Sequence, residues 1–154
     1  MPNEPRRTIL FVCTGNTCRS PMAEALFRAE LARAGLADAF DVASCGVSAM
    51  DGETASVNAV RAVAECGADL SAHRSRRISE AILARTLVLV GLTRGHVEAV
   101  EELFSELPPH VLVVNVPDPF GATLDGYRAA RDAIRAAFPR LIEFLSKLPE
   151  AKTA

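Results

Sequence analysis

Thr8-Ile-Leu-Phe-Val12 is followed directly by Cys13-Thr-Gly-Asn-Thr-Cys-Arg-Ser-Pro21, and this segment is the most informative about the fold. Its first half is apolar and partly β-branched, which predicts a buried strand, and the polar residues after it predict a tight loop. Helix formers follow Pro21, so we expect Ser20 to cap a helix, Pro21 to take its first position and Gly35 to end it. The stretch therefore predicts a strand–loop–helix unit.

Apolar segments typical of strands continue to alternate with segments typical of helices along the rest of the chain. Further strands are expected at Phe40–Ser44, Thr86–Val90 and Val111–Val114, and helices at Thr54–Cys66, Ser79–Ala84 and Arg94–Leu107, before a long final helix that Pro139 should kink or split. The buried stripes are expected to be Val57, Val60 and Val63 on one helix, and Val97, Val100, Leu103 and Phe104 on another. Apolar strands separated by amphipathic helices predict a doubly wound α/β fold with a four-stranded parallel sheet and helices on both faces.

Length, composition and net charge limit the number of domains, the kinds of partner and the cellular location. With 154 residues, 49% hydrophobic and 23% charged, we expect one domain over residues 1–154, an ordered core of approximately residues 8–148 and frayed residues 150–154. A net charge of -2 argues against nucleic-acid and anionic-membrane partners. No apolar run approaches the roughly 20 residues that cross a bilayer, and the amino terminus lacks a secretory pattern. We therefore expect a cytoplasmic protein.

The loop after the first strand carries the chemistry. The backbone N–H groups between Cys13 and Arg19 can point inward at one anion, with a helix amino terminus behind them. Gly15 and Asn16 are the residue types that most easily accept the unusual backbone angles of such a curl. The same dipoles would stabilise negative charge on Cys13, which we expect to be a thiolate nucleophile near neutral pH.

Two neighbours of the loop fit phosphoryl chemistry. Arg19 can grip two phosphate oxygens with its planar fork, and Ser20 can donate a hydrogen bond to the sulfur. A lone cysteine at a strand end is more often a packing residue, but the surrounding Gly, Asn, Arg and Ser favour catalysis. No Gly-Lys-Ser/Thr ends the loop, which excludes a Walker-type nucleotide site. Cys13 and Cys18 lack paired partners at zinc-ligand spacing, so no metal is expected.

Val-Cys-Thr-Gly-Asn-Thr-Cys-Arg-Ser-Pro, residues 12–21, closely resembles the phosphate loop of the low-molecular-weight protein tyrosine phosphatases. The resemblance covers nearly the whole chain, including Asp118-Pro119-Phe120-Gly121 before the final helix. It implies that Cys13 forms a cysteinyl-phosphate, that Arg19 binds the phosphoryl oxygens, and that Asp118 protonates the leaving group and then activates water. No cofactor is implied. The implied phosphate-binding loop consists of Thr14, Gly15, Asn16, Thr17, Cys18 and Ser20.

The resemblance also implies supporting residues. Ser44 and His73 are similar to family residues that hydrogen-bond to the loop asparagine, here Asn16. Cys45 stands where many relatives have alanine, and we expect it to pack. Cys18 either packs or forms a reversible disulfide with Cys13 that protects the nucleophile.

The family divides between phosphotyrosine and, in a bacterial branch, protein phosphoarginine. Thr17 replaces an aliphatic residue of many phosphotyrosine enzymes, and Phe120 is followed by Gly121 where those enzymes often have a second aromatic residue. Asp118 could pair with a guanidinium while it protonates the departing nitrogen. These features favour phosphoarginine on proteins, with phosphotyrosine as the alternative, and one small pocket change shifts discrimination by only about 1–3 kcal/mol. The expected partners are phosphorylated proteins and inorganic phosphate or other oxyanions in the loop.

Two other classes are weaker. Arsenate reduction, performed by some relatives of this fold, needs two further thiols near the loop. Cys45 and Cys66 are available, but they form no close pair, and residues 75–109 contain no cysteine. A non-catalytic phosphopeptide-binding module would lack the nucleophile or the acid, and both are present here.

Overall fold

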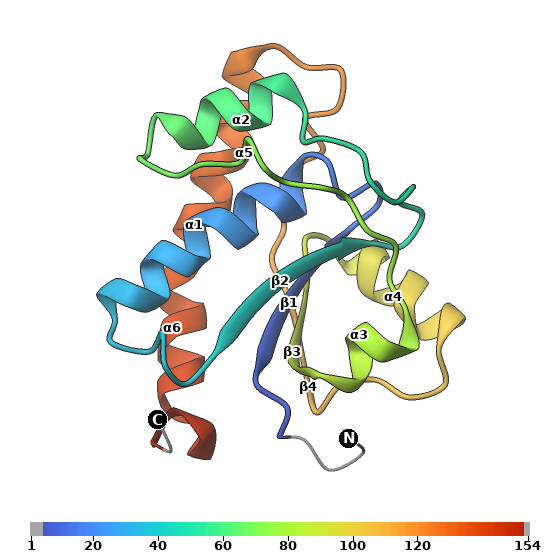
Figure 1. The fold of residues 1–154 in the computed structure, drawn as a ribbon, viewed down its shortest axis with the longest axis vertical. Coiled ribbons are helices and arrows are strands. Elements are labelled where there is room, and N and C mark those ends of the chain that lie inside the picture. The colour runs from blue at the N-terminus through green and yellow to red at the C-terminus, as the bar shows by residue number, and fades with distance from the viewer. Residues whose placement is uncertain (1–4, 153–154) are drawn as a thin grey trace.

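The computed structural model describes residues 5–152 and contains one parallel sheet (Figure 1). The strand order is β2-β1-β3-β4, and each neighbouring pair is parallel. The predicted fold class is therefore confirmed. The strands are β1 (Thr8–Cys13), β2 (Asp41–Gly46), β3 (Thr86–Gly91) and β4 (His110–Val113).

Helices cover both faces of the sheet (Figure 1). One layer consists of α1 (Arg19–Arg33), α2 (Val57–Ala64), α5 (Leu124–Ala136) and α6 (Phe138–Ser146), and the other of α3 (Glu80–Ala84) and α4 (Arg94–Leu103). A 3-10 helix, Pro149–Lys152, follows α6. Within residues 5–152, no helix has the length and apolarity needed to span a bilayer.

The central strand β1 explains why the chain needs both layers. Ile9 and Phe11 pack into the larger core beneath α1 and α5, whereas Leu10 and Val12 pack into the smaller core beneath α3 and α4. Successive side chains of a strand point to opposite faces, so an uninterrupted apolar run is buried only when both faces are covered. Phe27 extends the larger core by an edge-to-face contact with Phe11, with ring centroids 5.6 Å apart.

Two predicted helix stripes are partly wrong. Val57 is 73% exposed and Leu103 is 51% exposed. The α2 helix buries the predicted Val63, together with Ala59 and Ala62, which were not predicted. Residues three apart on an α-helix are separated by about 300° around the helix axis, which is about 60° short of a full turn. After two such steps, the third residue of the stripe therefore points about 120° away from the first. The fourth helix also ends earlier than expected, because Phe104 already has extended backbone with φ -133° and ψ 138°.

The ends of the remaining helices follow local sequence signals. Gly35, at φ +74°, lies just beyond the end of α1, as predicted. The final helix is split into α5 and α6, and Pro139 lies in the first turn of α6. Three expectations are wrong. The α1 helix begins at Arg19, so Pro21 is its third residue rather than its first, and Ser20 provides no side-chain cap. Residues 150–152 lie in a 3-10 helix rather than a frayed end. Residues 153–154 lie outside the described residues.

The strand order places one edge of the sheet at a switch point. The chain leaves β1 toward β2 on one side, while β3 lies on the other side of β1. Loops at the carboxyl ends of these strands diverge there and leave a crevice, which is where open α/β sheets bind ligands. The loop that follows β1, residues 14–18, lies at this point.

Candidate active site

The loop after β1 curls tightly over the end of β2. Asn16 has φ 56°, in the left-handed region, whereas Gly15 does not, so only Asn16 meets the expectation of unusual backbone angles. Gly46 permits the close approach, because a Cβ there would lie 2.5 Å from the carbonyl oxygen of Thr14 and 2.9 Å from the amide nitrogen of Asn16. The loop therefore rests directly on the backbone of β2.

The side chain of Asn16 holds this curl together. Its Nδ2 donates to Ser20 Oγ at 2.8 Å and to Ser44 Oγ at 3.0 Å. Its Oδ1 accepts from the Arg76 amide at 2.9 Å, which fixes the orientation of the side-chain amide. His73 Nε2 lies 2.8 Å from the main-chain carbonyl of Asn16. The predicted contacts of Ser44 and His73 are thus present, with His73 on the backbone of Asn16.

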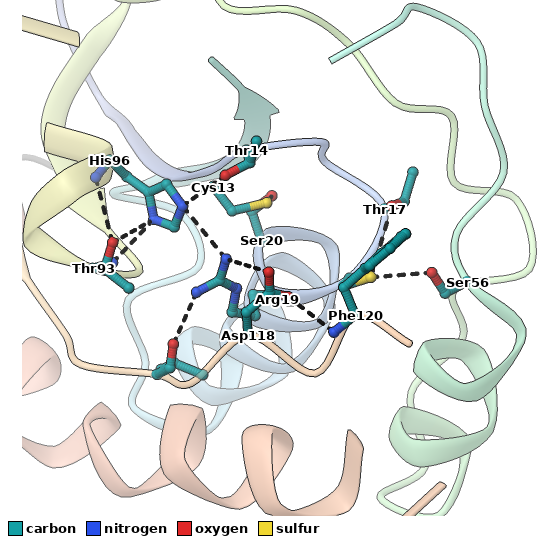
Figure 2. Close-up of polar contacts among 12 residues, drawn as sticks. Cys13, Thr14, Thr17, Arg19, Ser20, Ser56, Thr93, His96, Asp118 and Phe120 are labelled. Atoms are coloured by element: carbon teal, nitrogen blue, oxygen red, sulfur yellow. Dashed lines mark hydrogen bonds and ion pairs between the residues drawn. The ribbon is translucent and has the colours of Figure 1, made fainter. Parts of the chain in front are cut away.

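Cys13 lies at the base of the loop. It is buried, and its Sγ lies 2.9 Å from Ser20 Oγ. Arg19, at the start of α1, is also buried, and its Nη1 donates to the carbonyl of Val116 at 2.9 Å. Figure 2 shows the Arg19 guanidinium reaching the segment that carries Asp118. The loop after β1 and the loop before α5 thus meet at one guanidinium.

Asp118, in the loop before α5, lies close to Arg19. Its Oδ2 lies 3.7 Å from Arg19 Nη2, and its side chain is 58% exposed. Its Oδ1 accepts from the Phe120 amide at 2.9 Å, a local turn that fixes the direction of the carboxylate. A carboxylate held in this way can exchange a proton with a group bound between it and Cys13.

These residues line one cavity of about 430 Å³. Its mouth carries two exposed apolar side chains, Met50 and Phe120. Predicted site residues from both loops therefore meet in a single space. The lining residues are Cys13, Thr14, Gly15, Thr17, Cys18, Arg19, Ser48, Met50, Glu53, Asp118 and Phe120.

Cys18 lines the same cavity, and its sulfur lies among hydroxyl groups. Its Sγ is 3.1 Å from Ser56 Oγ and 3.4 Å from the hydroxyl of Tyr127. Burial raises the pKa of Tyr127, and its contact with Cys18 raises this pKa further. Cys18 and Cys13 are both unpaired, so a disulfide between them stays a prediction. Sequence reasoning missed Ser56 and Tyr127, whose places beside Cys18 depend on tertiary packing.

Cys45, in β2, is fully buried, as expected of a packing residue. Burial raises the pKa of its thiol to about 12. Cys66 lies just beyond the carboxyl end of α2, with its sulfur 3.5 Å from Arg135 Nη1 and outside the cavity. Across residues 5–152, no group of three or more His, Cys, Asp or Glu residues is placed to hold a metal ion.

His96, in the first turn of α4, is a further residue at the site that sequence reasoning missed. It is buried, and its Nε2 lies 3.1 Å from Thr14 Oγ1 and 3.5 Å from Arg19 Nη2 (Figure 2). Burial, followed by the charge of Arg19, lowers its pKa from 6.5 to about 4, although the charge of Asp118 acts in the opposite direction. The signal that could have found it is Thr93-Arg-Gly-His96, which begins two residues after the end of β3 and forms a capping box.

Several known proteins are similar to this chain over most of its length. A protein-arginine-phosphatase of Geobacillus stearothermophilus is 36% identical over 89% of this chain and 95% of its own length. An arsenate reductase of Brevibacillus brevis is 35% identical over 91% of this chain and 97% of its own. The structure of the YwlE arginine phosphatase, a mutant with a phosphorylated active-site serine, superposes with a TM-score of 0.88 at 32% identity, covering 94% of this chain and 99% of that one.

A family profile matches nearly the whole chain. The profile described as "Low molecular weight phosphotyrosine protein phosphatase" matches residues 8–151, a span that includes the cysteine loop, the aspartate loop and all four strands. With the cysteine, the arginine and the aspartate gathered around one cavity, the chain belongs to the low molecular weight phosphotyrosine protein phosphatase family.

Proposed function

We propose that this protein is a cysteine-dependent phosphatase that hydrolyses phosphoarginine on proteins through a cysteinyl-phosphate intermediate. The observation that carries the proposal is the meeting of Cys13, Arg19 and Asp118 around one cavity at the carboxyl edge of the sheet. A nucleophile, an oxyanion partner and a proton donor are the groups that a two-step phosphoryl transfer requires.

In the first step, Cys13 Sγ attacks phosphorus and the phosphorus–nitrogen bond breaks. Asp118 gives its proton to the departing guanidine nitrogen, which leaves as an arginine side chain. Arg19 and the loop amides hold the phosphoryl oxygens as charge develops on them.

In the second step, a water molecule attacks the phosphorus of the cysteinyl-phosphate. Asp118, now a carboxylate, takes a proton from this water, and the sulfur–phosphorus bond breaks. Ser20 donates to the departing sulfur, with its Oγ 2.9 Å from Sγ. Inorganic phosphate leaves, and Cys13 is regenerated. The phosphorylated serine in the YwlE mutant structure supports a covalent phospho-enzyme at this position.

The cavity wall supports a guanidinium over a phenol ring. Thr17 adds a hydroxyl to the wall, and Gly121, at φ +75°, leaves Phe120 as the aromatic residue at this point of the mouth. Asp118 and Glu53 place two carboxylates along the cavity, which suits a positively charged guanidinium. The relatives named protein-arginine-phosphatase support the same choice.

The test compares kcat/KM on one peptide carrying either phosphoarginine or phosphotyrosine. We expect wild type to prefer phosphoarginine and Thr17→Ile to shift the ratio toward phosphotyrosine. The Cys13→Ser variant should lose turnover, and Cys66→Ser, whose thiol lies outside the cavity, is the matched control. A wild-type preference for phosphotyrosine would contradict the substrate assignment, and turnover by Cys13→Ser would contradict the mechanism.

The distribution of cysteines disfavours arsenate reduction. A relay needs thiols that reach the loop and ionise. The Cys45 thiol is fully buried with a pKa raised to about 12, and Cys66 lies outside the cavity. Arsenate reduction supported by a dithiol reductant and abolished by Cys66→Ser would overturn this choice.

The cellular setting is part of the proposal. The four unpaired thiols suit a reducing compartment such as the cytoplasm. Cell fractionation with an antibody to the protein tests this assignment, and recovery outside the cytoplasmic fraction would contradict it.

A further inference from the structure

His96 is tied to the amino terminus of α4 through one ring nitrogen. The Thr93 amide donates to His96 Nδ1 at 3.1 Å. An amide N–H can only donate, so Nδ1 must carry a lone pair, and the proton of the neutral ring must lie on Nε2. A second proton could enter only at Nδ1, against the Thr93 N–H, and it would add a cation beside Arg19. The low pKa of His96 agrees with this geometry.

The proton on Nε2 has one acceptor among its two described contacts. Arg19 Nη2, at 3.5 Å, carries only donors, and Thr14 Oγ1 lies closer, at 3.1 Å. The imidazole therefore donates to the Thr14 hydroxyl, and the Arg19 guanidinium packs beside the ring without a hydrogen bond to it.

The Thr14 hydroxyl then has a hydrogen left to donate. Its oxygen accepts from His96, so its own hydrogen must point elsewhere. Thr14 directly follows the nucleophile and lines the same cavity as Cys13 and Arg19. Figure 2 shows Thr14, Cys13 and Arg19 lying together, with His96 on the side of α4.

We propose that His96 is a positioning residue that turns the Thr14 hydroxyl hydrogen into the cavity, where Thr14 donates to an oxygen of the bound phosphoryl group. The inference rests on the proposed function only in treating the cavity as an oxyanion site. Thr14 thereby adds a side-chain donor to the donors of the loop amides and Arg19. Because His96 is neutral, it orients this donor without placing another positive charge beside Arg19.

The test measures binding of inorganic phosphate by calorimetry at pH 7.5, which needs no turnover. Thr14→Val keeps the shape of the side chain and removes the hydroxyl, so we expect phosphate affinity to fall about tenfold or more, as for loss of a charge-assisted hydrogen bond. Thr14→Ser keeps the hydroxyl and should stay within about threefold of wild type. Phosphate affinity of Thr14→Val equal to that of wild type would overturn the proposal.

Two substitutions of His96 distinguish the role of its contact with Thr93 from that of its contact with Thr14. In His96→Asn the shorter side chain can still cap Thr93 but cannot reach Thr14, so phosphate affinity should fall severalfold while melting temperature changes little. In His96→Gln the longer side chain retains a donor near Thr14 and should recover most of that loss. Equal losses in both variants would indicate a structural role alone and would overturn the proposal.

The double variant Thr14→Val/His96→Asn tests whether His96 affects phosphate binding through the Thr14 hydroxyl. If His96 acts through the hydroxyl, the double variant should bind phosphate no more weakly than Thr14→Val. Losses that multiply would show that the two residues act separately and would contradict the proposal. Failure of phosphoarginine hydrolysis with intact coupling in phosphate binding would reject the proposed substrate and leave this inference standing.

Discussion

Ser20 Oγ lies 2.9 Å from Cys13 Sγ, and the direction of this hydrogen bond follows from a neighbour. Asn16 Nδ2 donates to the same oxygen at 2.8 Å, and the Arg76 amide fixes which end of the Asn16 amide carries hydrogen. Ser20 Oγ therefore accepts from Asn16, and its own hydrogen has two acceptors in reach, Cys13 Sγ and the Cys45 carbonyl. The carbonyl is farther away, at 3.4 Å, so the sulfur is the nearer acceptor. Asn16, which shapes the loop, thus also leaves the Ser20 hydroxyl able to donate a hydrogen bond to the Cys13 sulfur.

Removing this donor should slow the second chemical step. In Ser20→Ala we expect kcat to fall about 10- to 100-fold, because a negatively charged leaving sulfur loses a hydrogen bond. Rapid-quench measurement with an aryl phosphate should show a burst of product as the cysteinyl-phosphate accumulates. Ser20→Thr, which keeps the hydroxyl, is the control, and a slower burst with an unchanged steady-state rate in Ser20→Ala would place the serine in the first step instead.

Asp118 should matter most when the leaving group is poor. Its carboxylate is held by the Phe120 amide and faces Arg19, so Asp118→Asn keeps the local turn and removes the exchangeable proton. We expect kcat/KM to fall about 10²- to 10⁴-fold on substrates with basic leaving groups and much less on activated aryl phosphates. A series of aryl phosphates measures this dependence, and equal losses across the series would argue against a role as general acid.

Cys45 should be chemically silent in the folded protein. With a pKa of about 12, its thiol would be ionised to about one part in 10⁴ at pH 8. Iodoacetamide at pH 8 should leave the Cys45 peptide unmodified in native protein and should alkylate it after unfolding in guanidinium. Peptide mapping by mass spectrometry distinguishes the two states, and rapid native labelling of Cys45 would contradict its burial.

The elements of the fold could be predicted because their signals are local. The apolar run of β1, the glycine at position 35 and the proline at position 139 each act over a few residues. The side of α2 that faces the core could not be read in the same way. Small alanines, rather than the larger Val57, meet the neighbouring helices, and this choice depends on how closely the helices pack.

The same distinction holds for the candidate site. Cys13 and Arg19 belong to one short loop, so their proximity follows from sequence, and Asp118 was found through the family resemblance. His96, by contrast, lies 82 positions from Thr14, and Tyr127 lies 109 positions from Cys18. Contacts between such distant positions depend on strand order, which the local pattern of either residue does not contain.

His96 should make the protein lose stability on mild acidification. Its pKa is about 4 in the folded state against 6.5 ordinarily, so between these values the unfolded chain binds a proton that the folded chain does not. Stability is therefore fully present above pH 6.5 and falls toward pH 4, by about 3 kcal/mol for this one group. Urea unfolding at several pH values should show this loss in wild type.

The matched variant isolates the contribution of His96. His96→Gln lacks the titrating ring, so its stability should fall less between pH 7.5 and pH 4 than that of wild type, by the same about 3 kcal/mol. Carboxylates that titrate in this range are common to both proteins and cancel in the comparison. Parallel stability profiles for the two proteins would show that His96 is not held neutral by its surroundings.

Activity should depend on Gly46, although this residue of β2 does not line the cavity. Gly46→Ala places a Cβ 2.5 Å from the carbonyl oxygen of Thr14 and 2.9 Å from the amide of Asn16, two rigid backbone atoms. The loop must move away from β2, and a displacement of about 1 Å can cost about 10²-fold in rate. Gly95→Ala, where the nearest atom to the new Cβ is Thr93 Oγ1 at 3.6 Å, is the matched control and should keep both activity and stability. Crystal structures and kcat/KM of both variants test this, and full activity in Gly46→Ala would mean that the loop does not depend on its seat on β2.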